Sequence, residues 1–464
     1  MRPLKSLTFD QVIQELRATF EQVPDARAAD GVRYALADTL MSGFAMMFFQ
    51  HPSLLSFQRT MEKKKQDCNL KTIFKVQAVP SDTQMRTILD GAPTEPLRAV
   101  LPDWFAKVRR AGWAEQFRIG VPTKAGRKVR YTRMEEYYTL AVDGSQYFHS
   151  TAIQCPSCLH KTTSAKDSAA QPKDNAAQPE VTHYSHVVVG ASLVKAGTHT
   201  ILPLDAEQVR NTDGQDKQDC ELNAGKRLLR RVRREHRQMK IIVTGDDLYA
   251  HEPLVDELTD PLRMHYVLVA KPDSHKELFK WVADFEREGH SLHGQWEEGA
   301  AAKRHRFEYR IVRQVPLSGS LQRWVTFVEV WQRDRHGKLL YHNSWVTDLE
   351  VDADNVAIVI AIGRSRWKIE NEQFNVHKNH GYELEHNYGH GQKTLSMVFY
   401  LLSLLAFVAH ILLDMGDRLY QQCRREQSRR ELWNILRTAM HMVLVHSWQG
   451  LLLAYLDDDV ARAP

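Results

Sequence analysis

The segments EYYTLAVDGSQYF (136–148) and MKIIVTGDD (239–247) decide the fold. In each, a run of apolar, β-branched and aromatic residues leads to an aspartate, a pattern typical of a buried strand. Similar runs predict three further strands, at 183–194, 199–204 and 265–272. Helical spacing predicts two helices between the strands, at 219–238 and 251–259. Strands interspersed with helices in this order predict a mixed α/β architecture.

The chain is long enough, at 464 residues, for about two to four domains. Apolar residues recur at helical spacing near the N-terminus. Late in the chain the strand pattern returns and predicts three strands, at 304–315, 322–334 and 338–349, and a helical end follows them, broken around 379–391. A near-repeat, KDSAAQP then KDNAAQP, predicts a disordered surface loop. We therefore expect a helical domain at 1–130, the first part of the core at 131–289 with its loop at 161–180, a β-rich insertion at 290–350, and the last part of the core with C-terminal helices at 351–464.

Composition limits the class of protein. Hydrophobic residues make up 43% of the chain, which excludes bulk disorder. Five cysteines exclude a disulfide scaffold and fit a reducing cytosol, and the first twenty residues lack the apolar segment of a secretory signal. The net charge of +5 permits a nucleic-acid partner without requiring one. We expect a cytoplasmic protein.

The apolar segment 395–413 is long enough to span a bilayer. However, Ser396, Ser403, His410 and Asp417 recur every seven residues and form one polar stripe along a helix. A core helix of a soluble protein, touching polar groups along one edge, explains this pattern better than a helix that faces lipid.

Two aspartates are candidate ligands of a hard divalent cation. Asp143 follows YYTLAV and Asp246 follows IIVTG, so each marks the carboxyl end of a predicted central strand, where ligands of α/β sheets bind. Asp247 is the alternative to Asp246, which directly ends its strand. Asp after a strand is also ordinary turn chemistry.

The segment SRWKIENEQFNVHKNHGY (365–382) predicts a helix with a charged face. Arg366 and Glu370 are four residues apart, and His377 lies seven residues after Glu370, with Lys378 beside it. This face suits metal on one side and phosphate on the other, although exposed ion-pair helices are common. Glu372 points away and is expected to pair with Lys368.

With three carboxylates, this strand order and a β-rich insertion, the sequence resembles the insertion-sequence DDE transposases of the IS-four and Tn-five-like group. RWKIE (366–370) matches the centre of the group's third motif. The chain departs from that motif at Gly363, where the group has Tyr, and at His377, where it has Lys, with Lys378 one residue late. The resemblance implies an RNase H-like mixed sheet with flanking helices, and it implies that the N-terminal helical domain at 1–130 binds DNA.

The resemblance also implies the chemistry and the partners. Asp143, Asp246 and Glu370 would hold two Mg²⁺ ions, with Mn²⁺ as a substitute. The expected activity is cleavage of double-stranded DNA at the ends of a mobile element and strand transfer into target DNA, by a homodimer on the DNA, in the bacterial cytoplasm at the nucleoid and without a membrane. A catalytically silent DNA-binding protein derived from a transposase and a metal-dependent nuclease without strand transfer are the alternatives.

Several further residues are candidates for DNA contact. The helix KRLLRRVRREHR (226–237) is dense in arginine, with Arg230 and Arg234 as representatives. Trp324 and Trp331 could stack on a flipped base, although tryptophans such as these and Trp345 also pack well in sheets. Three lysines at 63–65 make the N-terminal region basic, as a DNA contact or as a solvated surface.

Cysteines and histidines suggest a second metal. Cys155 and Cys158 form CPSC after the first strand, and His183 and His186 begin the next one. If the two strands pair as a hairpin, these four side chains meet and predict a structural Zn²⁺ site, against a reduced thiol pair with solvent-facing histidines. His380, His386 and His390 are expected to be polar turn residues near DNA.

Overall fold

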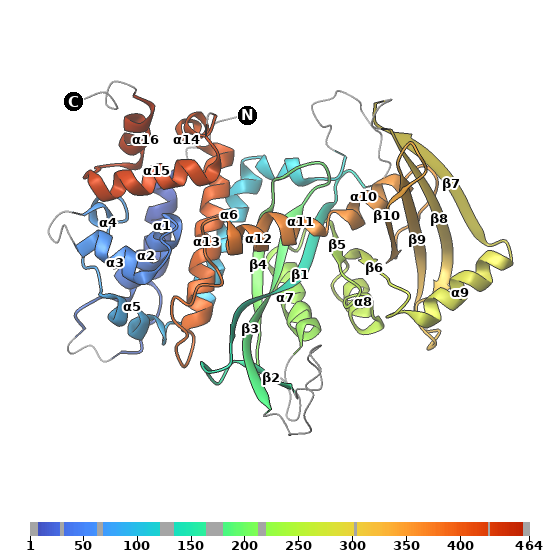
Figure 1. Ribbon diagram of the computed structural model, residues 1–464, viewed down its shortest axis with the longest axis horizontal. Coiled ribbons are helices and arrows are strands. Elements are labelled where there is room, and N and C mark those ends of the chain that lie inside the picture. Colours follow the sequence, from blue (N-terminus) through green and yellow to red (C-terminus); the bar gives the residue numbers. More distant parts are fainter. Residues whose placement is uncertain are drawn as a thin grey trace, which may run out of the picture.

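The structure is a computed structural model that describes residues 8–27, 32–62, 68–120, 134–163, 180–211, 220–300, 304–425 and 427–457. Within these residues ten strands form one mixed sheet, with helices on both of its faces and a helical body at one end (Figure 1). This confirms the predicted α/β class. The lysines at 63–65 and residues 164–179 of the predicted loop lie outside the described residues; residues 161–163 belong to a strand.

The centre of the sheet is built on β1 (Tyr138–Ser150). It pairs antiparallel with β3 (Val181–Val194) on one side and parallel with β5 (Ile241–Gly245) on the other, and β5 pairs parallel with β6 (His265–Val269). The far side of β3 is shared by β2 (Leu159–Thr163) and β4 (Leu202–Val209). The predicted strands are therefore present, and the first two form the expected hairpin.

The segment predicted as a β-rich insertion forms an antiparallel meander of four strands, where three were predicted. β10 pairs antiparallel with β6, so the meander extends the central sheet at its edge (Figure 1). The helix before the meander, α9 (Lys276–Arg287), covers part of it. The four strands are β7 (Ser291–Glu298), β8 (His305–Pro316), β9 (Trp324–Arg333) and β10 (Leu339–Thr347).

Two groups of helices cover opposite faces of the central strands. Neighbouring residues of a strand point to opposite faces. Arg366 reaches Asp143 from one face, and Glu221 lies against Gly144 on the other. The first face carries α10 (Val356–Arg364), α11 (Trp367–Ile369), the π-helical turn η4 (Glu370–Phe374) and α12 (Asn375–Asn379); the second carries α7 (Glu221–Glu235) and, beside it, α8 (Glu252–Thr259).

The helical body combines both ends of the chain. Phe9 stacks on Trp448 with ring centroids 4.5 Å apart, and Asn69 Nδ2 donates to the carbonyl of Met440 at 2.7 Å. The N-terminal part contains α1 (Phe9–Glu21), α2 (Leu36–Phe48), α3 (Leu54–Glu62), α4 (Asn69–Thr72), α5 (Asp82–Leu89), α6 (Glu95–Arg110) and η1 (Trp113–Phe117); the C-terminal part contains α13 (Leu395–Gly416), α14 (Arg418–Cys423), α15 (Arg429–Met442) and α16 (Trp448–Leu456).

Helix α13 stands between the N-terminal helices and the sheet (Figure 1). By length and composition this helix could cross a membrane, but 94% of its apolar stretch of 18 residues is buried inside the protein. Two residues of the predicted polar stripe meet polar partners: Ser396 bonds to the Tyr147 hydroxyl at 3.3 Å, and His410 Nε2 bonds to the carbonyl of Phe48 at 3.0 Å. This helix is therefore consistent with the core of a soluble protein.

Candidate active site

Asp143 and Asp246 lie side by side on neighbouring strands. The parallel pairing of β1 with β5 ends at Ala141 and Thr244, and each aspartate comes two residues later. Asp246 directly follows β5, as expected. Asp143 lies inside β1, which continues with β3 as its partner, so Asp143 marks the point where the parallel neighbour ends.

The segment with Glu370 crosses β1 and β3 over this point. Gly190 is the cross-strand partner of Asp143, and a Cβ there would lie 3.1 Å from the ring of Phe374. The glycine therefore lets η4 approach the sheet closely. Arg366 donates from Nη1 to Asp143 Oδ2 at 2.6 Å, with both side chains mostly buried. Glu370 is solvent-exposed, and its negative charge contributes to the raised pKa of Asp143.

Burial and like charges strongly perturb these carboxylates. The pKa of Asp143 is raised to about 7, first by burial; Arg366 opposes the shift, and three nearby carboxylates, Asp246, Glu221 and Glu370, add to it. Burial also raises the pKa of Asp246, with a contribution from Asp247. Carboxylates that are costly to ionise together suit a divalent cation, which neutralises them and prefers oxygen ligands.

Glu221 is a fourth carboxylate that the sequence did not indicate. It opens α7, accepts a hydrogen bond from the Tyr249 hydroxyl at 2.9 Å, and has a pKa raised by burial. A Cβ on Gly144 would lie 2.4 Å from its carboxylate, so the glycine after Asp143 makes room for it. The only signal in the sequence is that glycine, together with a lone acidic residue at the start of a basic helix.

Asp247, the alternative to Asp246, has its own partner. Lys271 Nζ lies 2.7 Å from Asp247 Oδ1. Although burial opposes it, hydrogen bonds from Lys271 and Ser274 hold the pKa of Asp247 below its ordinary value. Asp247 is therefore satisfied as an ion pair, which leaves Asp246 as the better candidate.

His377 was expected to face DNA, and this expectation is wrong. The side chain is fully buried between Tyr382 and Phe407, and burial lowers its pKa to about 3. The reason is the π-helical turn η4, which takes up one residue more than an α-helical turn and rotates everything after it. Lys378 is partly exposed instead and pairs with Glu385 at 3.1 Å.

Gly363, which departs from the resembled motif, has a packing reason. A Cβ at this position would lie 2.4 Å from Nε1 of Trp345, which is completely buried. Trp345 therefore fills the space that a larger residue at 363 would need. Trp331 also packs, stacked on His342 with centroids 5.3 Å apart, whereas Trp324 is 52% exposed.

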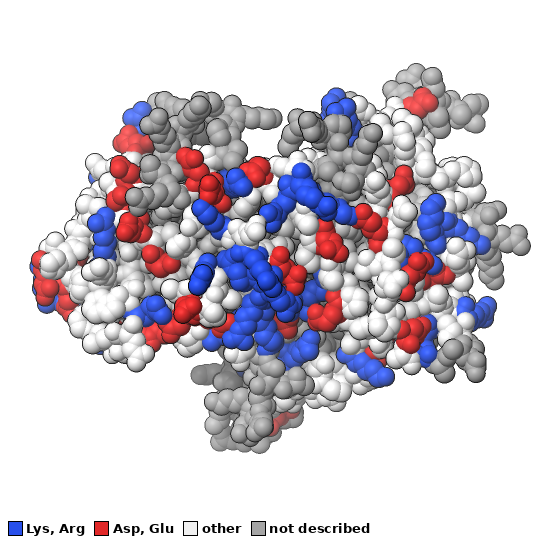
Figure 2. All heavy atoms as spheres, turned by 180° about the vertical axis from the view of Figure 1, so that it is seen from behind, with Lys and Arg blue, Asp and Glu red and all other residues white. Residues whose placement is uncertain are grey.

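The arginines of α7 are largely engaged with carboxylates. Arg230 forms two hydrogen bonds with Glu257, and Arg234 pairs with Glu235 at 3.1 Å. Figure 2 shows basic side chains gathered in the middle of the face opposite to that of Figure 1, interspersed with acidic ones. Arg230 and Arg234 lie nine and thirteen residues beyond Glu221 along α7, about 13 and 20 Å from the helix end that reaches the acidic site.

The cysteines and histidines converge in a different combination from the one expected. Cys155, Cys158, His186 and His390 offer ligand atoms that all lie within 4.8 Å of one another. His183 is not among them and bonds to His149 at 3.0 Å, because residues three apart in a strand point to opposite faces. Within the described residues the acidic side chains form no such tight group.

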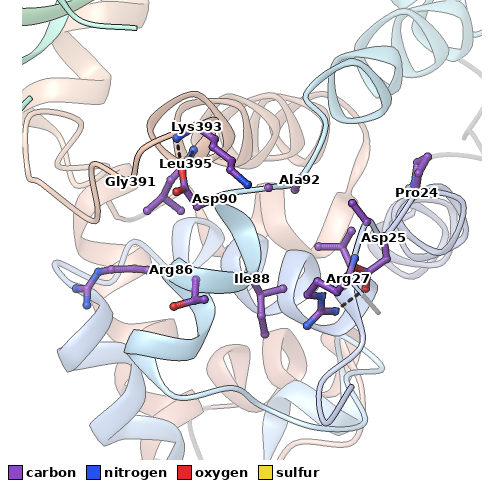
Figure 3. A pocket seen from close by; sticks show the side chains of 14 residues that line it. Pro24, Asp25, Arg27, Arg86, Ile88, Asp90, Ala92, Gly391, Lys393 and Leu395 are labelled. Atoms are coloured by element: carbon purple, nitrogen blue, oxygen red, sulfur yellow. Dashed lines mark hydrogen bonds and ion pairs between the residues drawn. The ribbon is translucent and has the colours of Figure 1, made fainter. Parts of the chain in front are cut away.

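A cavity of about 550 Å³ lies in the helical body, lined in part by Arg27, Arg86, Asp90 and Lys393 (Figure 3). None of the acidic site residues lines it. Comparison with known proteins adds no identification: the chain matches no protein-family model, and no curated protein matches it.

Proposed function

We propose that this protein is a DDE-type DNA transposase that cleaves the ends of a mobile element and transfers the freed strand into target DNA. One observation carries the proposal: Asp143, Asp246 and the segment with Glu370 converge on one point of the sheet, where burial, helped by the neighbouring carboxylates, raises the pKa of Asp143 to about 7. Strongly perturbed carboxylates gathered from distant segments are typical of catalytic sites.

The architecture supports the same proposal. Three antiparallel strands (β4, β3, β1) continue into two strands parallel to β1 (β5, β6), with helices on both faces. The β-rich meander comes in sequence between β6 and Glu370. This arrangement fits the RNase H-like core and the insertion that the sequence resemblance implies.

Lys378 gains a role from the local geometry. In the resembled motif a basic residue follows the glutamate by seven positions, and here Lys378 follows Glu370 by eight. The π-helical turn η4 absorbs one residue, so Lys378 takes the position that a seventh residue has in a regular helix. We propose that Lys378 and Arg366 bind DNA phosphates, and that the exposed Trp324 stacks on a base.

The oxygen donors of Asp143, Asp246 and Glu370 would hold Mg²⁺ or Mn²⁺. Two such ions would supply a deprotonated oxygen nucleophile and stabilise the leaving oxygen. Arg366 orients Asp143 through Oδ2, while the backbone N–H of Gly144 donates to Oδ1 at 3.0 Å. The protein's own task at this site is therefore to hold the carboxylates in a fixed arrangement.

The test uses a supercoiled plasmid that carries the DNA on both sides of the coding sequence, where the proposal expects inverted repeats. Wild-type protein with Mg²⁺ should nick at the repeat ends and join them to a second plasmid, and excess chelator should stop both reactions. Asp143→Asn and Asp246→Asn should each abolish cleavage while binding of the ends persists. Cleavage in the presence of chelator would overturn the proposal.

The same experiment separates the alternatives. Cleavage without joining would indicate a nuclease, and binding of the ends without cleavage would indicate a silent DNA-binding protein. Size measurement of the complex with paired ends should give two protein copies, as expected for a homodimer on DNA. The cytoplasmic, nucleoid-associated location belongs to the same proposal and is checked by imaging a tagged chain.

A further inference from the structure

A second cluster of reactive side chains lies away from the acidic site and joins three distant segments. Cys155 and Cys158 lie in the turn between β1 and β2, His186 belongs to β3, and His390 lies in the loop before α13. Three of the four side chains, Cys158, His186 and His390, are at least 91% buried. Such a concentration of soft ligands in the interior needs an explanation.

Four of the six distances between the ligand atoms match the edges of a tetrahedral zinc site, and all six are within 4.8 Å. The two sulfurs are 3.8 Å apart, His186 Nε2 lies 3.5 and 3.7 Å from them, and His390 Nε2 lies 3.3 Å from Cys158 Sγ. Zn–S and Zn–N bonds of about 2.3 and 2.0 Å in tetrahedral geometry give edges of about 3.8 Å for S···S and about 3.5 Å for S···N. We propose that Cys155, Cys158, His186 and His390 form a structural Zn²⁺ site.

The chemistry of the donors favours this ion. Two thiolates and two imidazoles in a tetrahedron select zinc over the hard cations of the acidic site. Four protein ligands leave no open position, so the site is structural rather than catalytic. A disulfide is the competing state of the CPSC pair, but both cysteines are free and their sulfurs are far beyond bonding distance.

The surroundings orient the ligands. Gln208 Nε2 lies 3.1 Å from His186 Nδ1; with the amide turned over, Gln208 Oε1 accepts from Nδ1–H, and this is the tautomer that leaves His186 Nε2 free to bind a metal. The ring of Phe148 lies 4.3 Å from that of His390 and shields the cluster. Gly391, in the left-handed region at φ 68°, turns the chain directly after His390, and a Cβ there would collide with Asp90.

The site would fasten the loop between α12 and α13 to the sheet. Asp90 accepts hydrogen bonds from the backbone N–H groups of Gln392 and Lys393, each at 2.9 Å (Figure 3). These bonds fix the chain that follows His390. With zinc bound, this loop is anchored to the β1–β3 hairpin on one side and to the helical body on the other. The inference does not depend on the proposed transposase activity.

Elemental analysis of the purified full-length protein should find one zinc per chain. Cobalt in its place should show the visible absorption of a tetrahedral ion together with thiolate-to-metal charge transfer. His390→Ala should reduce the zinc content or affinity at least about tenfold, as expected when one of four ligands is lost. His183→Ala and His386→Ala are matched controls in neighbouring positions and should keep one equivalent.

A second measurement guards against variants that fail to fold. Alkylation of the wild-type protein, read by mass spectrometry, should leave Cys155 and Cys158 unmodified until a chelator is added, and zinc should restore both their protection and the melting temperature. Absence of zinc, full zinc in His390→Ala, or loss of zinc in His183→Ala would each overturn the proposal. Binding of cobalt without thiolate charge transfer would do the same.

Discussion

At the scale of single residues, Glu370 and Glu372 have different neighbours although only one residue separates them. The charge of Glu370 contributes to the raised pKa of Asp143, whereas Glu372 Oε1 lies 3.0 Å from His199 Nδ1. Lys368, the expected partner of Glu372, bonds instead to the carbonyl of Thr198. Glu370→Gln should therefore lower the rate of Mg²⁺-dependent cleavage by at least ~10³-fold.

Glu372→Gln is the matched control for this prediction. It should leave the cleavage rate within a few-fold of wild type and cost about 0.5 kcal/mol of stability, the value of an exposed pair. An inactive Glu372→Gln beside an active Glu370→Gln would show that the catalytic glutamate has been assigned to the wrong face of the helix.

Glu221 offers a prediction about pH. Its charge adds to the burial that raises the pKa of Asp143, so Glu221→Gln should lower that pKa. Metal binding needs the deprotonated carboxylate, and the acid limb of the cleavage–pH profile should therefore move to lower pH. Tyr249 can still donate to the amide oxygen, which keeps the packing intact. An unchanged acid limb in Glu221→Gln would remove Glu221 from the site.

At the scale of elements, the π-helical turn η4 makes an unusual prediction about deletion. Because this turn has one residue more than an α-helical turn, deleting the exposed Asn371 should let it close as a regular turn while both flanks keep their contacts. The melting temperature should fall by only a few degrees. Deleting Val359 from the regular helix α10 is the control: it rotates the residues beyond it by about 100° and should prevent folding.

The elements that the sequence predicted correctly are those with strong local patterns. The strands around Asp143 and Asp246 are runs of buried apolar residues, and α7 and α8 lie where helical spacing placed them. Strand β7 was missed because its residues SLHGQWEE are mostly exposed and polar, without the alternation of a half-buried strand. The π-helical turn was missed because regular helical phasing assumes α-helical geometry throughout.

The candidate sites could be predicted only in part, for a similar reason. The aspartates follow recognisable strands, so local sequence sufficed. Glu221 reaches Asp143 from the opposite face of the sheet, and His390 reaches Cys158 across 232 positions of the chain. Such pairings depend on tertiary packing, which a single sequence does not reveal.

At the scale of the whole molecule, the two chain ends should unfold together. Trp433 is completely buried and packs against Phe48 of α2 and His410 of α13. Trp433→Ala should cost about 3–5 kcal/mol, the usual loss for a buried aromatic residue. Calorimetry should show the helical body melting at lower temperature in one transition. Trp324→Ala, at an exposed position, should leave the melting temperature almost unchanged.

The stability of the molecule should fall in acid because histidines are buried in their neutral form. Burial lowers the pKa of His51 and of His377 to about 3 in the folded protein, against an ordinary value of 6.5. Between these values the unfolded chain binds the protons and the folded chain does not. The stability that these groups contribute is thus complete above about pH 6.5 and is lost toward pH 3, at roughly 1.4 kcal/mol per pH unit for each.

Asp143 acts in the opposite direction, since burial raises its pKa to about 7 and the folded chain holds its proton. Burial also raises the pKa of Asp205, Glu221 and Asp246, but five histidines outside the cysteine–histidine cluster have a lowered pKa and outnumber these four carboxylates: His51, His236, His275, His377 and His410. The melting temperature should therefore fall from pH 6.5 to pH 4.5. His377→Leu removes one titrating group whose ring nitrogens have no hydrogen-bond partner among the described residues. It should reduce the slope of the free energy of unfolding against pH by about 1.4 kcal/mol per pH unit, the effect of one proton. Equal slopes in wild type and His377→Leu would mean that His377 is already accessible to protons in the folded protein.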